Sequence, residues 1–187
     1  MNIQFNEQDR NTLLQLAKES IKYGLDNHEP LSVTLNNYAE TLQSKRASFV
    51  TLNINHQLRG CIGSLVAHRP LAEDIAHNAY AAAFSDPRFP SLSETEFSLL
   101  EYHLSVLSES SPMSFASEED LLQQMRPGID GLILEDNGQR GTFLPSVWEQ
   151  LPDAVSFLKH LKQKAGLPIN HWSNNIKVSR YTVESIE

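Results

Sequence analysis

The sequence has a single cysteine among its 187 residues, so it cannot form an internal disulfide. The same shortage excludes a secreted disulfide scaffold and a structural zinc site built on several thiolates. No uninterrupted apolar run approaches the roughly 18 residues that a membrane-spanning helix needs. The amino terminus lacks the basic start and apolar core of a signal peptide. We therefore expect a cytoplasmic protein with no membrane contact.

Basic residues are also few, since 15 Lys and Arg stand against 23 Asp and Glu. The net charge is −8; residues 1–70 carry seven Lys and Arg against six Asp and Glu, whereas residues 71–187 carry eight against seventeen. Because binding to a phosphate backbone needs clustered cations, we expect no nucleic-acid partner. The sequence contains no phosphate-binding loop, no dinucleotide-binding glycine motif and no zinc pattern among its seven histidines. We therefore expect no metal and no cofactor.

Hydrophobic periodicity predicts helices that alternate with pairs of strands. Apolar residues recur at helical spacing near 6–25, 71–84 and 153–165, whereas β-forming residues predict strands at 48–54, 58–64, 101–107, 131–135, 139–143 and 176–183. Residues 26–47 show no convincing period. Strand pairs joined by short turns predict an α+β fold, a mostly antiparallel sheet flanked by helices. We expect one domain over 1–187 with its main body at about 48–165, which leaves the termini to form any smaller subdomain.

Two local details can be checked directly. Pro70 fits the first position of the helix that follows it, since that position needs no N–H. In the helix after Asp153, the spacing of Val155, Leu158 and Leu161 predicts that these three side chains face the core.

The hexapeptide Leu58-Arg-Gly-Cys-Ile-Gly63 is the most distinctive stretch, because two glycines flank the only cysteine. In a regular strand Arg59 and Cys61 share one face. Cys61 is then either a small buried hydrophobe or a nucleophilic or redox-sensitive thiol that Arg59 activates. For the second alternative His103, on another alternating strand, is the best candidate for a catalytic base.

Three arginines lie beside glycine or proline, namely Arg59, Arg88 and Arg140. If they converge, they can hold a carboxylate or phosphate in a bidentate manner. The alternative is that each pairs with a local acid, for example Arg88 with Asp86 or Arg140 with Glu135.

The loop from Asp86 to Pro90 has two interpretations. It can form the rim of a pocket with Phe89 as an apolar wall, because ordered loops often carry function. Alternatively it is a rigid helix stop in which Asp86 caps free backbone N–H groups.

The hexapeptide resembles the signature of the AMMECR domain family, known in microbes as AmmeMemoRadiSam system protein A. Further blocks across residues 10–185 are similar to the same family: 69–74, 83–90, 128–135, 140–148, 157–162 and 180–184. The resemblance implies an α+β fold with an antiparallel sheet. It also implies two partners, a Memo-like protein and a radical S-adenosylmethionine enzyme, but it supplies no reaction.

Two hypotheses of function follow. In the first, the protein is an enzyme or catalytic subunit that acts on a small anionic metabolite or modified amino acid. Cys61, Arg59 and His103 are then catalytic, and the ligand-binding residues are Gly60, Gly63, Asp86, Arg88, Phe89 and Arg140. In the second, the protein is a non-catalytic interaction module. Gly60 and Gly63 then permit tight packing, and Cys61 is buried.

Overall fold

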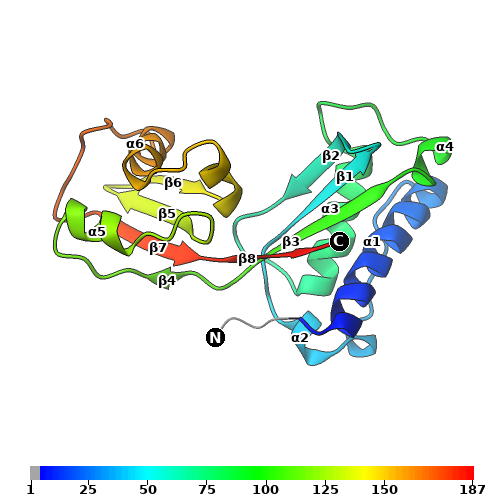
Figure 1. The fold of residues 1–187 in the computed structure, drawn as a ribbon. Coiled ribbons are helices and arrows are strands. Elements are labelled where there is room, and N and C mark those ends of the chain that lie inside the picture. Colours follow the sequence, from blue (N-terminus) through cyan, green and yellow to red (C-terminus); the bar gives the residue numbers. More distant parts are fainter. Residues whose placement is uncertain (1–4) are drawn as a thin grey trace. The chain divides into compact units, whose positions relative to one another are not determined.

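The computed structural model describes residues 5–187, and this part of the chain forms two compact units (Figure 1). The first comprises residues up to 107 together with 184–187, and the second comprises 108–183. Each contains a four-stranded sheet and helices, which confirms the predicted α+β class. The division differs from the expected main body at 48–165, because residues 48–107 belong to the first unit and 108–165 to the second. None of the helices in 5–187 combines the length and hydrophobicity that crossing a bilayer requires.

In the first unit the sheet has the strand order β2-β1-β3-β8. Its strands are β1 (Ser48–Ile54), β2 (Gln57–Gly63), β3 (Glu101–Leu107) and β8 (Val183–Ile186), and β1 pairs antiparallel with both β2 and β3. Positive φ angles at Asn55 and His56 form the tight turn between β1 and β2.

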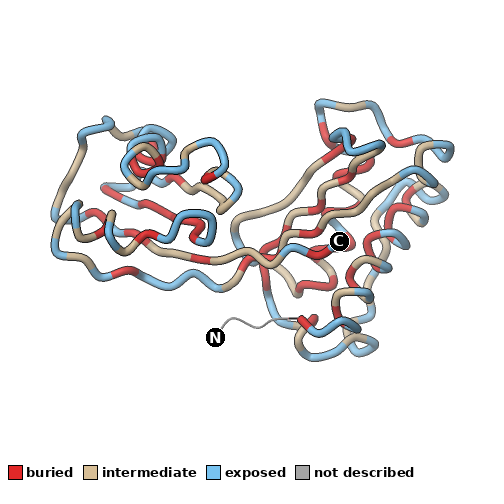
Figure 2. Tube along the Cα trace, in the orientation of Figure 1, coloured by how far each residue is buried: buried red, intermediate tan, exposed pale blue. Residues whose placement is uncertain are grey.

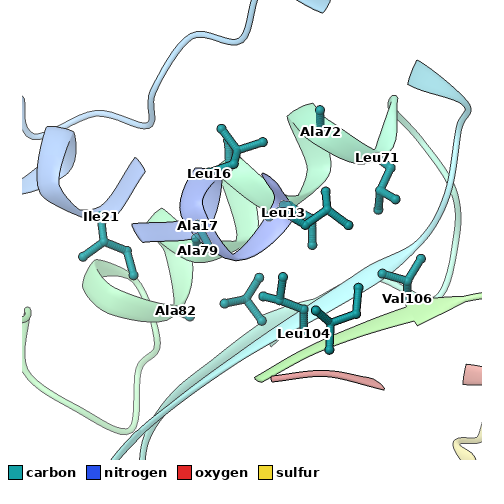
Figure 3. Packing of buried hydrophobic residues seen from close by; sticks show 14 of the residues in the cluster. Leu13, Leu16, Ala17, Ile21, Leu71, Ala72, Ala79, Ala82, Leu104 and Val106 are labelled. Carbon is teal, nitrogen blue, oxygen red and sulfur yellow. The ribbon is translucent and has the colours of Figure 1, made fainter. Parts of the chain in front are cut away.

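Two long helices, α1 (Glu7–Asn27) and α3 (Leu71–Phe84), build the core of this unit. Asn6 caps α1, because its side chain accepts a 2.8 Å hydrogen bond from the Asp9 N–H. Figure 3 shows apolar side chains of α1 meeting those of α3 above Leu104 and Val106 of β3. In Figure 2 the buried segments follow these same helices and strands. The helices therefore cover one face of the sheet.

Pro70 is the N-cap residue of α3 and not its first helical residue, since its backbone is extended with ψ near 145°. The alanines of α3 allow this helix to approach the sheet closely. A side chain added at Gly60 would sit 3.0 Å from the carbonyl carbon of Ala82 and closer still to its oxygen. Gly60 is thus the point where β2 and α3 touch through their backbones.

The connections of the first unit contain only short elements. Residues 28–47 form η1 (Leu35–Asn37) and α2 (Glu40–Gln43), and α4 (Glu94–Phe97) follows α3. Ser93 and Glu96 form a capping box at the start of α4, in which the Ser93 N–H donates to Glu96 Oε2 at 2.9 Å.

The second unit has the strand order β4-β7-β5-β6. These strands are β4 (Ser111–Pro112), β5 (Gly131–Asp136), β6 (Gln139–Phe143) and β7 (Lys177–Tyr181), and its helices are α5 (Glu118–Gln124), η2 (Pro145–Glu149) and α6 (Ala154–Lys164). Trp148 stacks on Phe157 with ring centroids 3.9 Å apart, at the centre of the core of this unit.

Two predictions fail in this unit. Val155 is 47% exposed, because the buried stripe of α6 runs through Phe157, Leu158 and Leu161 and leaves Val155 at its edge. The predicted closing strand at 176–183 is two strands, β7 and β8, which lie in different sheets. The backbones of Ser108 and Thr182 are joined by a 2.9 Å hydrogen bond where the chain passes between the two units.

Candidate active site

The hexapeptide lies on β2, an edge strand of the first sheet, and it contains a β-bulge. Leu52 pairs with Gly60 while Asn53 pairs with Leu58, so Arg59 is an extra residue without a partner on β1. The simple alternation that placed Arg59 and Cys61 on one face does not hold across this bulge.

Arg59 is buried and its contacts lead away from the thiol. Its Nε donates to Glu96 Oε1 at 2.8 Å, and its Nη2 donates to the Pro90 carbonyl at 2.9 Å. The hydrogen bond from Arg59 lowers the pKa of Glu96 from 4.5 to about 2. Nη1 has no hydrogen-bond partner among residues 5–187. Arg59 therefore fixes the loop that leads into α4.

Cys61 is partly exposed, and its neighbour is a threonine. Thr51, directly opposite on β1, donates from Oγ1 to Cys61 Sγ at 3.1 Å. Thr51 alternates with the buried Val50 and Leu52, so Thr51 and Cys61 lie on the sheet face that is turned away from α1 and α3.

His103 lies in the same cross-strand row but does not reach the thiol. His103, on β3, pairs with Thr51 on β1, and Thr51 pairs in turn with Cys61 on β2. Two strand spacings, together about 10 Å, therefore separate the backbone of His103 from that of Cys61. The imidazole is 36% exposed, and its Nδ1 lies 3.2 Å from Glu187 Oε1. Thr51 is therefore the residue between the candidate nucleophile and the candidate base.

Asp86 and Arg88 close the free edge of β2 at Cys61. The Cys61 N–H donates to Asp86 Oδ2 at 2.9 Å, and Arg88 Nη2 donates to the Cys61 carbonyl at 3.4 Å. Arg88 also donates to both oxygens of Asp86, at 3.0 and 2.7 Å. The side-chain hydrogen bonds from Arg88, the largest cause, and the backbone hydrogen bond from Cys61 hold the pKa of the buried Asp86 well below its usual range. The pair satisfies the backbone groups that an edge strand leaves unpaired.

Phe89 brings two of the three arginines together. The Cζ atoms of Arg59 and Arg88 lie 5.9 and 5.5 Å from the centre of its ring. Arg88 keeps 54% of its side chain exposed. Arg140 is in the second unit, on β6, where its Nε pairs with Glu135 at 3.0 Å. Each of the three arginines is thus paired with an acid, and of the three Arg88 contacts Cys61.

The two glycines of the hexapeptide have packing roles. Gly60 contacts the backbone of Ala82, and a side chain at Gly63 would overlap the Phe49 ring and the Ser48 carbonyl. Ligand contact by either glycine stays a prediction. In the described part of the chain no group of three or more His, Cys, Asp or Glu side chains could hold a metal ion.

Sequence reasoning missed Thr51 and Glu96, the direct partners of Cys61 and Arg59. The expected strands, 48–54 and 58–64, leave a three-residue turn, and this register already places Thr51 opposite Cys61, although no role for Thr51 was predicted from it. In the structure the turn is shorter, Asn55 and His56, and the bulge at Arg59 produces the same pairing of Thr51 with Cys61.

Comparison with known proteins gives consistent results. The sequence model of the AMMECR1 family matches residues 14–186. A protein from Thermofilum pendens is 33% identical over 184 residues, which cover 92% of this chain and 86% of that protein. A protein from Methanothermobacter thermautotrophicus is 35% identical over 158 residues, covering 84% and 82%. The crystal structure of an uncharacterized protein from Pyrococcus horikoshii superposes with a TM-score of 0.80 at 31% identity, covering 97% of this chain and 92% of that one.

Proposed function

The chain belongs to the AMMECR1 family, and from this premise we propose that it is a thiol-dependent enzyme or catalytic subunit of the cytoplasm. Its substrate is a small anionic metabolite or modified amino acid. It works with a radical S-adenosylmethionine enzyme and a Memo-like protein, the partners that the family resemblance implies.

One observation carries the catalytic part of the proposal: Cys61 is partly exposed while its backbone is held on both sides. Asp86 binds its N–H and Arg88 its carbonyl. The Thr51 hydroxyl donates to the sulfur, and a donor at this position stabilises a thiolate more than a thiol. Such a fixed and hydrogen-bonded sulfur has the geometry that a nucleophile or redox group needs.

The neighbouring residues take different roles in this proposal. Arg88 is the contact for an anionic substrate, because it is half exposed beside Cys61. Arg59 positions the loop of Phe89 and does not activate the thiol. Since Thr51 lies between them, transfer of the thiol proton to His103 is a relay: Thr51 Oγ1 takes the proton from sulfur as its own O–H proton passes to the imidazole, and the new O–H then donates to the thiolate.

Alkylation by iodoacetamide across a range of pH tests the proposal. We expect Cys61 to react in the folded chain, and to react more slowly in Thr51→Val, which keeps the shape of the side chain and removes the donor. A thiol that reacts only after denaturation, or a Thr51→Val profile that coincides with that of the unsubstituted chain, would contradict it.

A second function, a non-catalytic interaction module, is favoured by the packing roles of Gly60 and Gly63 and by the acid paired with each arginine. Co-purification with the radical enzyme or the Memo-like protein separates the two. Partner binding that survives Cys61→Ser, with an unreactive thiol in the unsubstituted chain, supports the module. Loss of partner binding in a folded Cys61→Ser variant counts against it.

A further inference from the structure

An aromatic ring of the first unit lies outside its core, on the sheet face turned away from α1 and α3. Phe49 alternates on β1 with Ser48 and Val50, which are fully buried, so its side chain points to the opposite face from theirs. Phe49 is partly exposed and is not among the apolar side chains that form or adjoin the core of this unit. Its ring meets no other aromatic ring within residues 5–187. Core packing therefore does not account for an aromatic residue here.

The ring is directed toward β2, the strand that carries Cys61. Phe49 pairs with Gly63, and a side chain added at Gly63 would overlap the Cγ and Cδ1 atoms of the ring, so the ring lies over this glycine. Thr51 pairs with Cys61 in the next row of the same face, which makes Phe49 and Cys61 diagonal neighbours. The Cβ atoms of such neighbours are about 7–8 Å apart, a distance that an aromatic side chain spans. The Phe49 ring therefore lies beside Cys61.

A cation flanks Cys61 at the edge of the sheet. Arg88 uses Nε and Nη2 to bind Asp86, and Nη2 also reaches the Cys61 carbonyl. Its Nη1 donates to no group in the described part of the chain, and 54% of the side chain is exposed. Asp86 is buried, so the guanidinium is the outward-facing member of this neutral pair. Its free N–H groups can bind a carboxylate or another oxyanion.

We propose that Phe49 and Arg88 select the substrate of Cys61, a small molecule that combines a planar conjugated or aromatic group with an oxyanion. The planar group lies on the Phe49 ring, where an aromatic contact adds to the burial of apolar surface. The oxyanion binds Nη1 of Arg88. Gly63 is a positioning residue for this selection, because a side chain there would displace the ring. The inference rests on the proposed thiol function and specifies the anionic substrate that this function requires.

Thiol–disulfide exchange with three reagents tests the selection. Dithiobis(nitrobenzoate) is aromatic and anionic, dithiodipyridine is aromatic and uncharged at neutral pH, and bis(hydroxyethyl) disulfide is neither. In each exchange the Cys61 thiolate attacks one sulfur of the reagent, a new S–S bond forms, and the other half leaves as a thiolate with the electron pair of the broken bond. Each rate is divided by the rate for the urea-unfolded chain, which removes the differences between the leaving groups.

We expect the folded chain to prefer the aromatic reagents over the aliphatic one, and the anionic aromatic reagent over the uncharged one. Phe49→Leu keeps an apolar side chain and removes the ring, so it should lower the ratio of aromatic to aliphatic rates about fivefold. Arg88→Gln should lower the ratio of anionic to uncharged aromatic rates about tenfold. Phe97→Leu is the matched control, since Phe97 is also partly buried in the first unit but packs against its core. Both ratios should stay at the parent values in this variant.

Folded-chain ratios equal to those of the unfolded chain would overturn the inference and leave the proposed function standing, because the thiol would still react. So would an equal loss of the aromatic preference in Phe97→Leu and Phe49→Leu. If Arg88→Gln slows both aromatic reagents equally, the oxyanion contact is refuted. A thiol that none of the reagents modifies in the folded chain refutes the proposed function itself, and this inference with it. If a variant does not fold, the ratios of the unsubstituted chain still decide.

Discussion

Replacement of Gly60 by alanine offers the sharpest test of the packing beneath the hexapeptide. The new Cβ would lie 3.0 Å from the carbonyl carbon of Ala82, and its oxygen is closer still. Carbon atoms in contact are optimally about 3.5–4.0 Å apart, so α3 and β2 must separate locally by about 1 Å. Both atoms of Ala82 belong to the backbone of a helix, so no side chain can rotate to make room.

The expected loss of stability follows from this geometry. Overpacking a core costs about 1–3 kcal/mol, and we place Gly60→Ala at about 3 kcal/mol because the obstacle is rigid. For a unit of this size that corresponds to a fall in Tm of about 10 °C or more. Urea denaturation followed by backbone circular dichroism measures the loss of stability, and thermal unfolding measures the fall in Tm.

Gly24→Ala is the matched control within the same unit. There the new Cβ meets only side-chain atoms, Tyr80 Cδ2 at 2.6 Å and Phe84 Cε2 at 2.7 Å, which can move. Alanine also favours the interior of α1 by about 1 kcal/mol over glycine. We therefore expect a markedly smaller loss than at Gly60. Equal losses, or a Gly60→Ala variant within about 0.5 kcal/mol of the parent, would refute the reasoning.

Three further predictions concern charged groups. The pKa of Glu96 is lowered to about 2 in the folded chain, so the Glu96 carboxylate stabilises the fold above pH 4.5, its unfolded pKa, and this stabilisation is lost as the pH falls toward 2. Urea denaturation at several pH values should show the loss, and in Glu96→Gln this pH dependence should be absent. Lys162→Met should be neutral or stabilising, because Lys162 is fully buried whereas its partner Glu118 keeps contact with water. Glu118→Gln should instead cost about 3 kcal/mol in urea denaturation, because it leaves the buried ammonium group unpaired; similar losses in the two variants would contradict this asymmetry.

Local signals in the sequence predict local structure well in this chain. The ranges of β1, α3 and β3 coincide with the predicted ones, because each has a clear period and a turn or proline at its ends. The partners of Arg88 and Arg140 were among the stated alternatives, since an acid lies a few residues away in each case.

Features that depend on long-range pairing had no such signal. The division at residue 107 follows from which sheet each strand joins, and hydrophobic periodicity carries no information on that choice. The bulge at Arg59 is a single extra residue, and it leaves Thr51 opposite Cys61 although the turn is shorter than predicted. Likewise, His171 and Asp136 are 35 positions apart, and only the folded segment between α6 and β7 brings them into contact.

Packing accounts for some residues of the hexapeptide and not for others. Gly60 and Gly63 are required by backbone and ring atoms that leave no room for a side chain, and Arg59 is required by Glu96. Cys61 is different, because it is partly exposed and lies on the sheet face turned away from both helices. Serine or alanine would meet the same backbone contacts with Asp86 there. Since the fold does not demand sulfur at this position, the chemistry of the thiol is the property on which a function of the hexapeptide has to rest.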